Sequence, residues 1–203
     1  MDSLFKADNL AQIFNPDSYR SMPWRNGLGH TIELLAEHLP ESSDFAWRLS
    51  MADVVSDGVF SDFSGYDRTL LLLKGQGLTL VHSHGRDELT GKLQAAQFKG
   101  DEECHATLHQ GPITDFNIMS KRDLCSTTVG CFINADNDKL TVNSDILLVY
   151  AADETITLSS ATQATLTLEA NHLLQINKPD NEVWTVSGPS LIAIQVHYND
   201  ELS

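Results

Sequence analysis

Side chains able to bind a polar ligand are concentrated in one short stretch, residues 24–33, with the sequence WRNGLGHTIE. This stretch holds an indole, a guanidinium, a carboxamide, an imidazole, a hydroxyl and a carboxylate around Gly27 and Gly29. Glycine permits positive φ angles and close backbone approach, which a tight turn or a bound ligand requires. Trp24 and Asn26 are therefore candidate ligand contacts. A polar surface loop leading into a strand at residues 31–35 is the alternative interpretation.

A second candidate is Arg48, which lies in a segment of alternating side chains. Positions 45, 47, 49 and 51 are large and apolar, and they predict the core-facing side of a strand. Ala46, Ser50 and Ala52 on the other side are small. Small residues beside one arginine are typical of a barrel interior, where a guanidinium pairs with a planar carboxylate through two hydrogen bonds. An exposed face with an ordinary surface arginine is the alternative.

Three more polar residues extend this hypothesis. Asp115 and Asn117 are two positions apart in a strand-like segment, so they share one face of it. Facing inward they would suit the interior of a barrel, and facing outward they would be ordinary surface residues. Arg68 follows Asp67, which would either orient the guanidinium or neutralise its charge.

The elements that must position these residues are short strands at regular spacing. Apolar strands are predicted at residues 69–73 and 78–81, and the glycines of the KGQG segment between them indicate a hairpin. A weaker series of strands follows residue 125, and helical periodicity is nearly absent. Short internal matches recur at offsets of 78 and 79 residues. The sequence therefore predicts an all-β fold with two similar barrels, residues 1–125 and 126–203, packed as one compact unit.

Composition excludes several classes of partner. The chain has 28 acidic and 13 basic residues among 203, a formal charge of −15, which argues against nucleic acid or an anionic membrane. It has no apolar run of about 18 residues, and its first residues do not resemble a signal peptide. Three cysteines without Cys-x-x-Cys spacing fit reduced thiols. We therefore expect a cytoplasmic protein.

Motifs for metal ligands and for a catalytic nucleophile are weak in this sequence. His82-x-His84-x-x-x-Glu88 copies a metal-ligand spacing, but it follows a glycine-rich turn and is interpreted as solvent-exposed turn sequence. No Gly-x-Ser-x-Gly elbow occurs, and Cys125 is the one cysteine in a basic local sequence. The sequence thus predicts no metal, no cofactor and no catalytic nucleophile.

Four separated motifs resemble the HutD/Ves family. They are MPWRNGLG with Thr31 and Glu33, FAWRLS at residues 45–50, GVFSDFSGYDRTL at residues 58–70, and FKGD at residues 98–101 followed by DFNIM at residues 115–119 with Arg122. The resemblance implies a cupin-like fold with two barrel halves and a connection with bacterial histidine utilisation. It also implies that residues 60–67 would be the metal-bearing segment, where Phe60, Ser61 and Phe63 offer no imidazole. His30 departs from the family pattern, in which a smaller residue is expected.

These observations lead to one hypothesis with two alternatives. The chain is predicted to be a metal-free bicupin that binds a small carboxylate, such as urocanate, formylglutamate or formate, in a regulatory role. A homodimer is also among the expectations. The alternatives are a metal-independent isomerase, lyase or hydrolase that uses Glu33, His30 or Asp115 as acid or base, and a metal-dependent oxygenase. The predicted ligand-binding residues are Trp24, Asn26, His30, Glu33, Arg48, Ser50, Arg68, Asp115 and Asn117.

Overall fold

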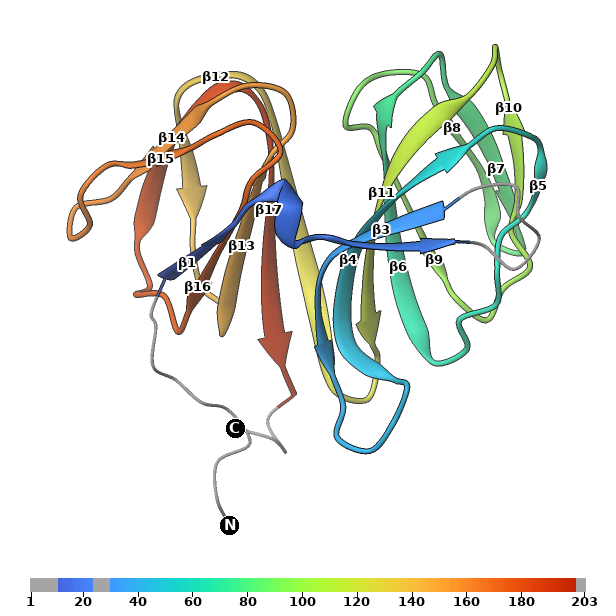
Figure 1. Cartoon of the computed structure of the whole chain (residues 1–203), viewed down its shortest axis with the longest axis horizontal. Helices are drawn as coiled ribbons and strands as arrows, with labels where there is room; N and C mark the ends of the chain where they lie inside the picture. The colour runs from blue at the N-terminus through green and yellow to red at the C-terminus, as the bar shows by residue number, and fades with distance from the viewer. Residues whose placement is uncertain (1–10, 24–29, 200–203) are drawn as a thin grey trace. The chain divides into compact units, whose positions relative to one another are not determined.

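Antiparallel strands make up nearly all the regular structure in the computed structural model, which describes residues 11–23 and 30–199 (Figure 1). The described chain divides into two units. The N-unit consists of residues 19–126 together with residue 199, and the C-unit consists of residues 11–18 and 127–198. Two predicted contacts, Trp24 and Asn26, lie outside the described residues.

Two antiparallel sheets form the N-unit. One is six-stranded, in the order β2-β3-β4-β11-β6-β9, and the other is four-stranded, in the order β5-β10-β7-β8. The strands of the first are β2 (Arg20–Pro23), β3 (His30–His38), β4 (Phe45–Val54), β11 (Ile113–Lys121), β6 (Tyr66–Lys74) and β9 (Ala95–Lys99). Those of the second are β5 (Gly58–Val59), β10 (His105–Leu108), β7 (Leu78–His82) and β8 (Gly85–Leu89).

The two sheets enclose an apolar core. Leu70 and Leu72 of β6 pack with Leu78 and Leu80 of β7, while alternate residues of β6 face the other side of the sheet. This follows from the two-residue period of a strand, which sends every second side chain to the same face. We call the face of the six-stranded sheet that carries Leu70 and Leu72 the inner face. The candidate residues that were predicted to line the interior of a barrel would lie on this face.

The predicted hairpin at residues 69–81 is wrong, although both of its strands are present. β6 pairs with β9 and β11, whereas β7 pairs with β8 and β10, so the turn carries the chain from one sheet to the other. Gly75 and Gly77 have φ angles of 106° and 119°, which side-chain-bearing residues rarely adopt. These glycines therefore mark a crossing between sheets, which local sequence does not distinguish from a hairpin.

The C-unit is built on a seven-stranded sheet. Its order is β1-β16-β13-β17-β14-β15, and β12 also pairs with β17. Its core is apolar and contains Trp184, Leu147 and Val186 among other buried side chains. Its elements are β1 (Ala11–Phe14), a short 3-10 helix (Pro16–Ser18), β12 (Cys125–Thr141, which begins in the N-unit), β13 (Ile146–Ala151), β14 (Ile156–Ser159), β15 (Leu166–Leu168), β16 (Leu173–Asn177) and β17 (Val183–Tyr198).

The all-β prediction is confirmed. Within residues 11–23 and 30–199, no helix has the length and apolar character needed to span a bilayer.

Gly100 fixes the loop that leads into β6. Its N–H donates to the Tyr66 carbonyl and its own carbonyl accepts from Phe63 N–H, each at 2.8 Å. A Cβ atom on Gly100 would lie only 2.2 Å from the Phe63 carbonyl oxygen. Only a residue without a side chain fits there, so the glycine sets the position of Phe63.

We expect Gly100→Ala to lower the free energy of unfolding by about 1–3 kcal/mol, because the added methyl group overlaps rigid backbone. Urea denaturation measures the change. Gly58→Ala is the matched control, since its Cβ would meet no atom within 4 Å, and it should change stability by less than about 0.5 kcal/mol. Equal stability of the two variants would contradict this packing argument.

Candidate functional site

Strand register brings the predicted polar residues together on the inner face. Met119 of β11 lies between Arg48 of β4 and Arg68 of β6 in one row across the sheet. The next row places Asn117 between Ser50 and Leu70, and the following row places Asp115 between Ala52 and Leu72. Because Leu70 and Leu72 face the core between the two sheets, the arginines and Asp115 face it too.

Arg68 is almost completely buried, with 6% of its surface exposed. Its Nη2 donates to Asn117 Oδ1 at 2.8 Å and its Nη1 donates to the Ser61 carbonyl at 3.4 Å. The Nε atom is buried and has no hydrogen-bond partner among residues 11–23 and 30–199. Burial lowers the pKa of Arg68 to about 10, although Asp115 and Cys104 oppose that shift. The guanidinium is still charged near neutral pH.

Arg48 is half-buried beside it. Its Nη2 contacts Met119 Sδ at 3.6 Å, and its Nε is buried without a hydrogen-bond partner. Burial lowers the pKa of Arg48, while the charges of Glu33 and Tyr66 act in the opposite direction. The five N–H donors of this guanidinium are thus mostly available to another molecule.

Aromatic rings surround both guanidiniums. The Phe63 ring centroid lies 5.2 Å from the guanidinium carbon of Arg48 and 5.4 Å from that of Arg68. Phe45 covers Arg48 at 4.8 Å, and Phe98 and Phe60 cover Arg68 at 4.9 and 5.3 Å. Such cation–π contacts stabilise a charge without supplying a hydrogen-bond acceptor. Sequence reasoning missed these rings as site residues, although residues 60–63 belong to one of the motifs that carry the family resemblance.

Asp115 and Asn117 form a hydrogen-bonded chain with Arg68. Asn117 accepts from Arg68 and donates through Nδ2 to Asp115 Oδ1 at 2.6 Å. Asp115 is only 1% exposed, and burial raises its pKa to about 7, more than the charge of Arg68 and the hydrogen bonds from Asn117 and Ala52 lower it. Close to neutral pH this carboxyl group therefore exchanges a proton easily.

The other predicted residues divide into two groups. Ser50 and Glu33 are buried and lie opposite each other in the β3–β4 register, and Glu33 Oε1 lies 3.6 Å from His38 Nε2. His30 is exposed and lies on the other face of β3 from Glu33, because the two positions differ by an odd number of residues. The structure therefore brings Glu33 and Ser50 to the arginines and leaves His30 away from them.

The arrangement can hold an anion. Within residues 11–23 and 30–199, no carboxylate lies within ion-pair distance of Arg48 or Arg68. Two partly desolvated guanidiniums with unpaired Nε atoms are suited to binding a carboxylate.

The buried thiols are unsuited to nucleophilic chemistry. Burial raises the pKa of Cys104 to about 11 and that of Cys125 to about 12. Cys125 Sγ also donates to the Ala46 carbonyl at 3.2 Å. Both side chains thus remain protonated thiols near neutral pH.

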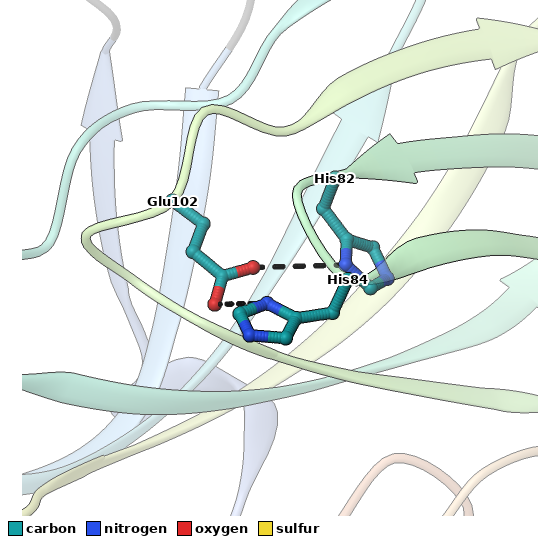
Figure 2. Close-up of side chains that lie close together, drawn as sticks. All are labelled: His82, His84 and Glu102. Carbon is teal, nitrogen blue, oxygen red and sulfur yellow. Dashed lines mark ion pairs between the residues drawn. The ribbon is translucent and has the colours of Figure 1, made fainter.

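One set of potential metal ligands occurs among the described residues: His82, His84 and Glu102 (Figure 2). His84 lies in the turn after β7 and its side chain is 70% exposed, as expected. The His82 side chain, however, is only 8% exposed, because its ring stacks on Phe98 with centroids 6.0 Å apart. The interpretation of His82 as an exposed turn residue is therefore wrong.

The raised pKa of Asp115 predicts a pH dependence of stability. The folded protein binds this proton more tightly than the unfolded chain, whose carboxyl pKa is 3.8. Stability from Asp115 is therefore fully present below that value, falls as the pH rises to about 7, and is level above it. The slope is at most about 1.4 kcal/mol per pH unit.

Asp115→Asn should remove this contribution, so we expect the stability of the wild type relative to the variant to fall between pH 4 and 7. Urea denaturation across that range measures the difference. Asp53→Asn, which removes an exposed carboxylate from the neighbouring strand, controls for the change in net charge. A constant difference between wild type and Asp115→Asn would contradict the assignment.

Comparison with known proteins identifies the family. The sequence model of the family described as HutD matches residues 16–194. A protein called Ves, from Citrobacter koseri, is 32% identical over 172 residues, which cover 81% of this chain and 88% of that protein.

Solved structures give a consistent result. A conserved protein of unknown function from Pseudomonas aeruginosa PAO1 aligns with a TM-score of 0.83 at 28% identity, covering 92% of this chain and 98% of that one. HutD from Pseudomonas fluorescens SBW25, in a formate condition, aligns at 0.78 and 24% identity, covering 93% and 99%. An oxalate decarboxylase from Lactobacillus farciminis, in a formate complex, aligns at 0.60 and 9% identity, covering 97% and 88%, and shares the fold alone. The prediction of a cupin-like fold is confirmed. Because the family match extends over most of the sequence, this chain belongs to the HutD family.

Proposed function

We propose that this protein binds a small carboxylate on the inner face of the N-unit, at Arg48 and Arg68, and that binding rather than turnover is its role. The observation that carries the proposal is a pair of guanidiniums, that of Arg68 buried and that of Arg48 half-buried, each with an unpaired Nε and with no carboxylate at ion-pair distance among the described residues. A carboxylate ligand would supply the charge and the acceptors that both side chains lack there.

The physical case rests on desolvation. A buried cation loses hydration free energy, which an ion pair with good hydrogen-bond geometry offsets. The rings of Phe63 and Phe98 offset part of it through their negative faces, yet among the described residues they leave the Nε–H donors unpaired. A planar carboxylate can accept two parallel hydrogen bonds from one guanidinium, so it matches what remains unsatisfied.

The family membership suggests which carboxylates to test. The resemblance to the HutD family implies a connection with histidine utilisation, and one relative has a structure in a formate condition. Formate, urocanate and formylglutamate each carry the required carboxylate and differ in length. Under this proposal the protein reports or buffers the concentration of such a metabolite.

A specific observation favours one other function, which is acid–base catalysis by Asp115. Its pKa of about 7 is the value at which a carboxyl group both gives and accepts a proton readily near neutral pH. Through Asn117, Asp115 is also connected to Arg68, which would hold the substrate. In this second proposal, the ligand bound by the arginines is converted as well as held.

Arg48→Ala is expected to weaken carboxylate binding about ten- to a hundredfold, because a hydrogen-bonded charge contributes about 1.5–3 kcal/mol. Isothermal titration calorimetry with formate, urocanate and formylglutamate measures the affinities. Arg86→Ala is the matched control, since it removes the same charge from an exposed ion pair with Glu88 and should leave affinity unchanged. Wild-type protein that binds none of the three ligands would remove the proposal, and equal affinity in Arg48→Ala would exclude Arg48 from the site.

Turnover is tested separately. If binding is the whole function, NMR spectra of each carboxylate incubated with wild-type protein should show no product. Product that forms with the wild type and is absent with Asp115→Asn would replace the binding proposal with the catalytic one. The Arg86→Ala variant, which should behave as the wild type does, controls for loss of active protein during purification.

A further inference from the structure

A carboxylate and two imidazoles converge at one end of the four-stranded sheet of the N-unit. His82 is the last residue of β7, His84 lies in the following turn, and Glu102 lies in the loop between β9 and β10. Figure 2 shows the two oxygens of Glu102 directed at the two rings. His84 Nδ1 lies 2.8 Å from Oε1 and His82 Nδ1 lies 3.6 Å from Oε2.

The protonation of His82 follows from its other ring nitrogen. His82 Nε2 lies 2.9 Å from Asp87 Oδ2. An ionised carboxylate can only accept a hydrogen bond, so Nε2 carries the proton in this pair. In a neutral imidazole the other nitrogen, Nδ1, then holds a lone pair. That lone pair is directed at Glu102.

Two buried polar atoms therefore face each other without a hydrogen bond between them. His82 Nδ1 and Glu102 Oε2 are both buried, and neither has a hydrogen-bond partner. Their separation of 3.6 Å exceeds the usual N–H···O length of about 2.7–3.2 Å, so the two atoms are not hydrogen-bonded. A buried carboxylate oxygen and an imidazole nitrogen at this distance require a positive charge between or beside them, which either a proton on the ring or a metal ion supplies.

The spacing agrees with shared coordination of a metal ion. Zinc binds histidine nitrogen and carboxylate oxygen at about 2.0–2.2 Å in tetrahedral geometry, which places two ligand atoms about 3.4 Å apart. The three candidate ligand atoms lie within 4.8 Å of one another, so small side-chain rotations would bring all three to one ion.

We propose that His82, His84 and Glu102 form a binding site for a divalent transition-metal ion, for which zinc is the best match. Two imidazoles and one carboxylate suit zinc better than calcium or magnesium, which prefer oxygen ligands alone. Three protein ligands leave a fourth position for water or another small ligand. The exposed side chain of His84 gives the ion a route from solvent.

Asp87 completes the arrangement as a positioning residue. Metal-binding histidines commonly donate their second ring N–H to a carboxylate, which fixes the tautomer and the ring orientation. The Asp87 carboxylate is in that position, and the stacking of His82 on Phe98 restrains the same ring from its face. None of the three proposed metal ligands is assigned to carboxylate binding, so the proposal stands independently of the proposed function.

The test uses full-length protein without a polyhistidine tag, stripped with EDTA and desalted. We expect isothermal titration with zinc chloride to show one equivalent bound, and Glu102→Gln or His84→Ala to weaken binding at least about tenfold. His84→Ala changes an exposed side chain, so it tests the site even if Glu102→Gln fails to fold. Asp87→Asn should reduce affinity about ten- to a hundredfold while a cobalt(II)-substituted sample keeps the visible spectrum of tetrahedral coordination.

Two matched controls separate this site from adventitious binding. Glu103 and His105 form an exposed carboxylate–imidazole pair at 2.7 Å, so Glu103→Gln removes the same chemistry from outside the site. Cys131→Ser removes the exposed thiol. Both variants should bind zinc as the wild type does. The proposal is overturned if the wild type binds no zinc, or if folded His84→Ala binds it with unchanged affinity.

Discussion

Burial of two guanidiniums is the constraint on which the N-unit depends. Arg48 and Arg68 lie in one row of the six-stranded sheet, where Arg68 is buried and Arg48 is half-buried. Among the described residues, no carboxylate lies at ion-pair distance from either arginine. Neighbouring side chains offset part of the hydration free energy that the two guanidiniums lose. Aromatic rings cover the charges, and Asn117 accepts one hydrogen bond from Arg68. Asp115 contributes a more distant negative charge, but burial raises its pKa and so favours the neutral carboxyl group. What remains unpaired among the described residues are the Nε–H donors of both arginines, which we propose that an anion accepts from.

The C-unit shows that an antiparallel β unit of this chain does not itself require these charges. Its core is apolar throughout, and Ser190 is the one fully buried polar side chain among its described residues. The buried arginine and carboxyl side chains are all in the N-unit: Glu33, Arg68 and Asp115. Buried ionisable groups usually destabilise a fold relative to apolar ones of similar size. Their concentration in one unit among the described residues is consistent with the proposed binding site, since the architecture of the other unit does without them.

Local sequence pattern could predict the strands and which residues share a face, because the two-residue period is a property of each strand alone. Arg48, Ser50, Asp115 and Asn117 follow from that period. The pairing of strands could not be predicted in this way, which is why the glycine-rich turn between β6 and β7 was mistaken for a hairpin. The ring of Phe63 between the arginines and the burial of His82 depend on contacts between distant segments, and no local signal distinguishes them from surface residues.

The position of Phe98 connects the two candidate sites of the N-unit. One ring stacks on the imidazole of His82 and also lies 4.9 Å from the guanidinium carbon of Arg68. A metal ion held by His82 and an anion held by Arg68 would thus both lie close to the Phe98 ring, and their opposite charges would attract each other. Thermodynamic linkage makes this effect reciprocal. If the bound cation raises the affinity for the anion by some factor, the bound anion raises the affinity for the cation by the same factor. Phe98 would then be the side chain that contacts both binding sites, one for a cation and one for an anion.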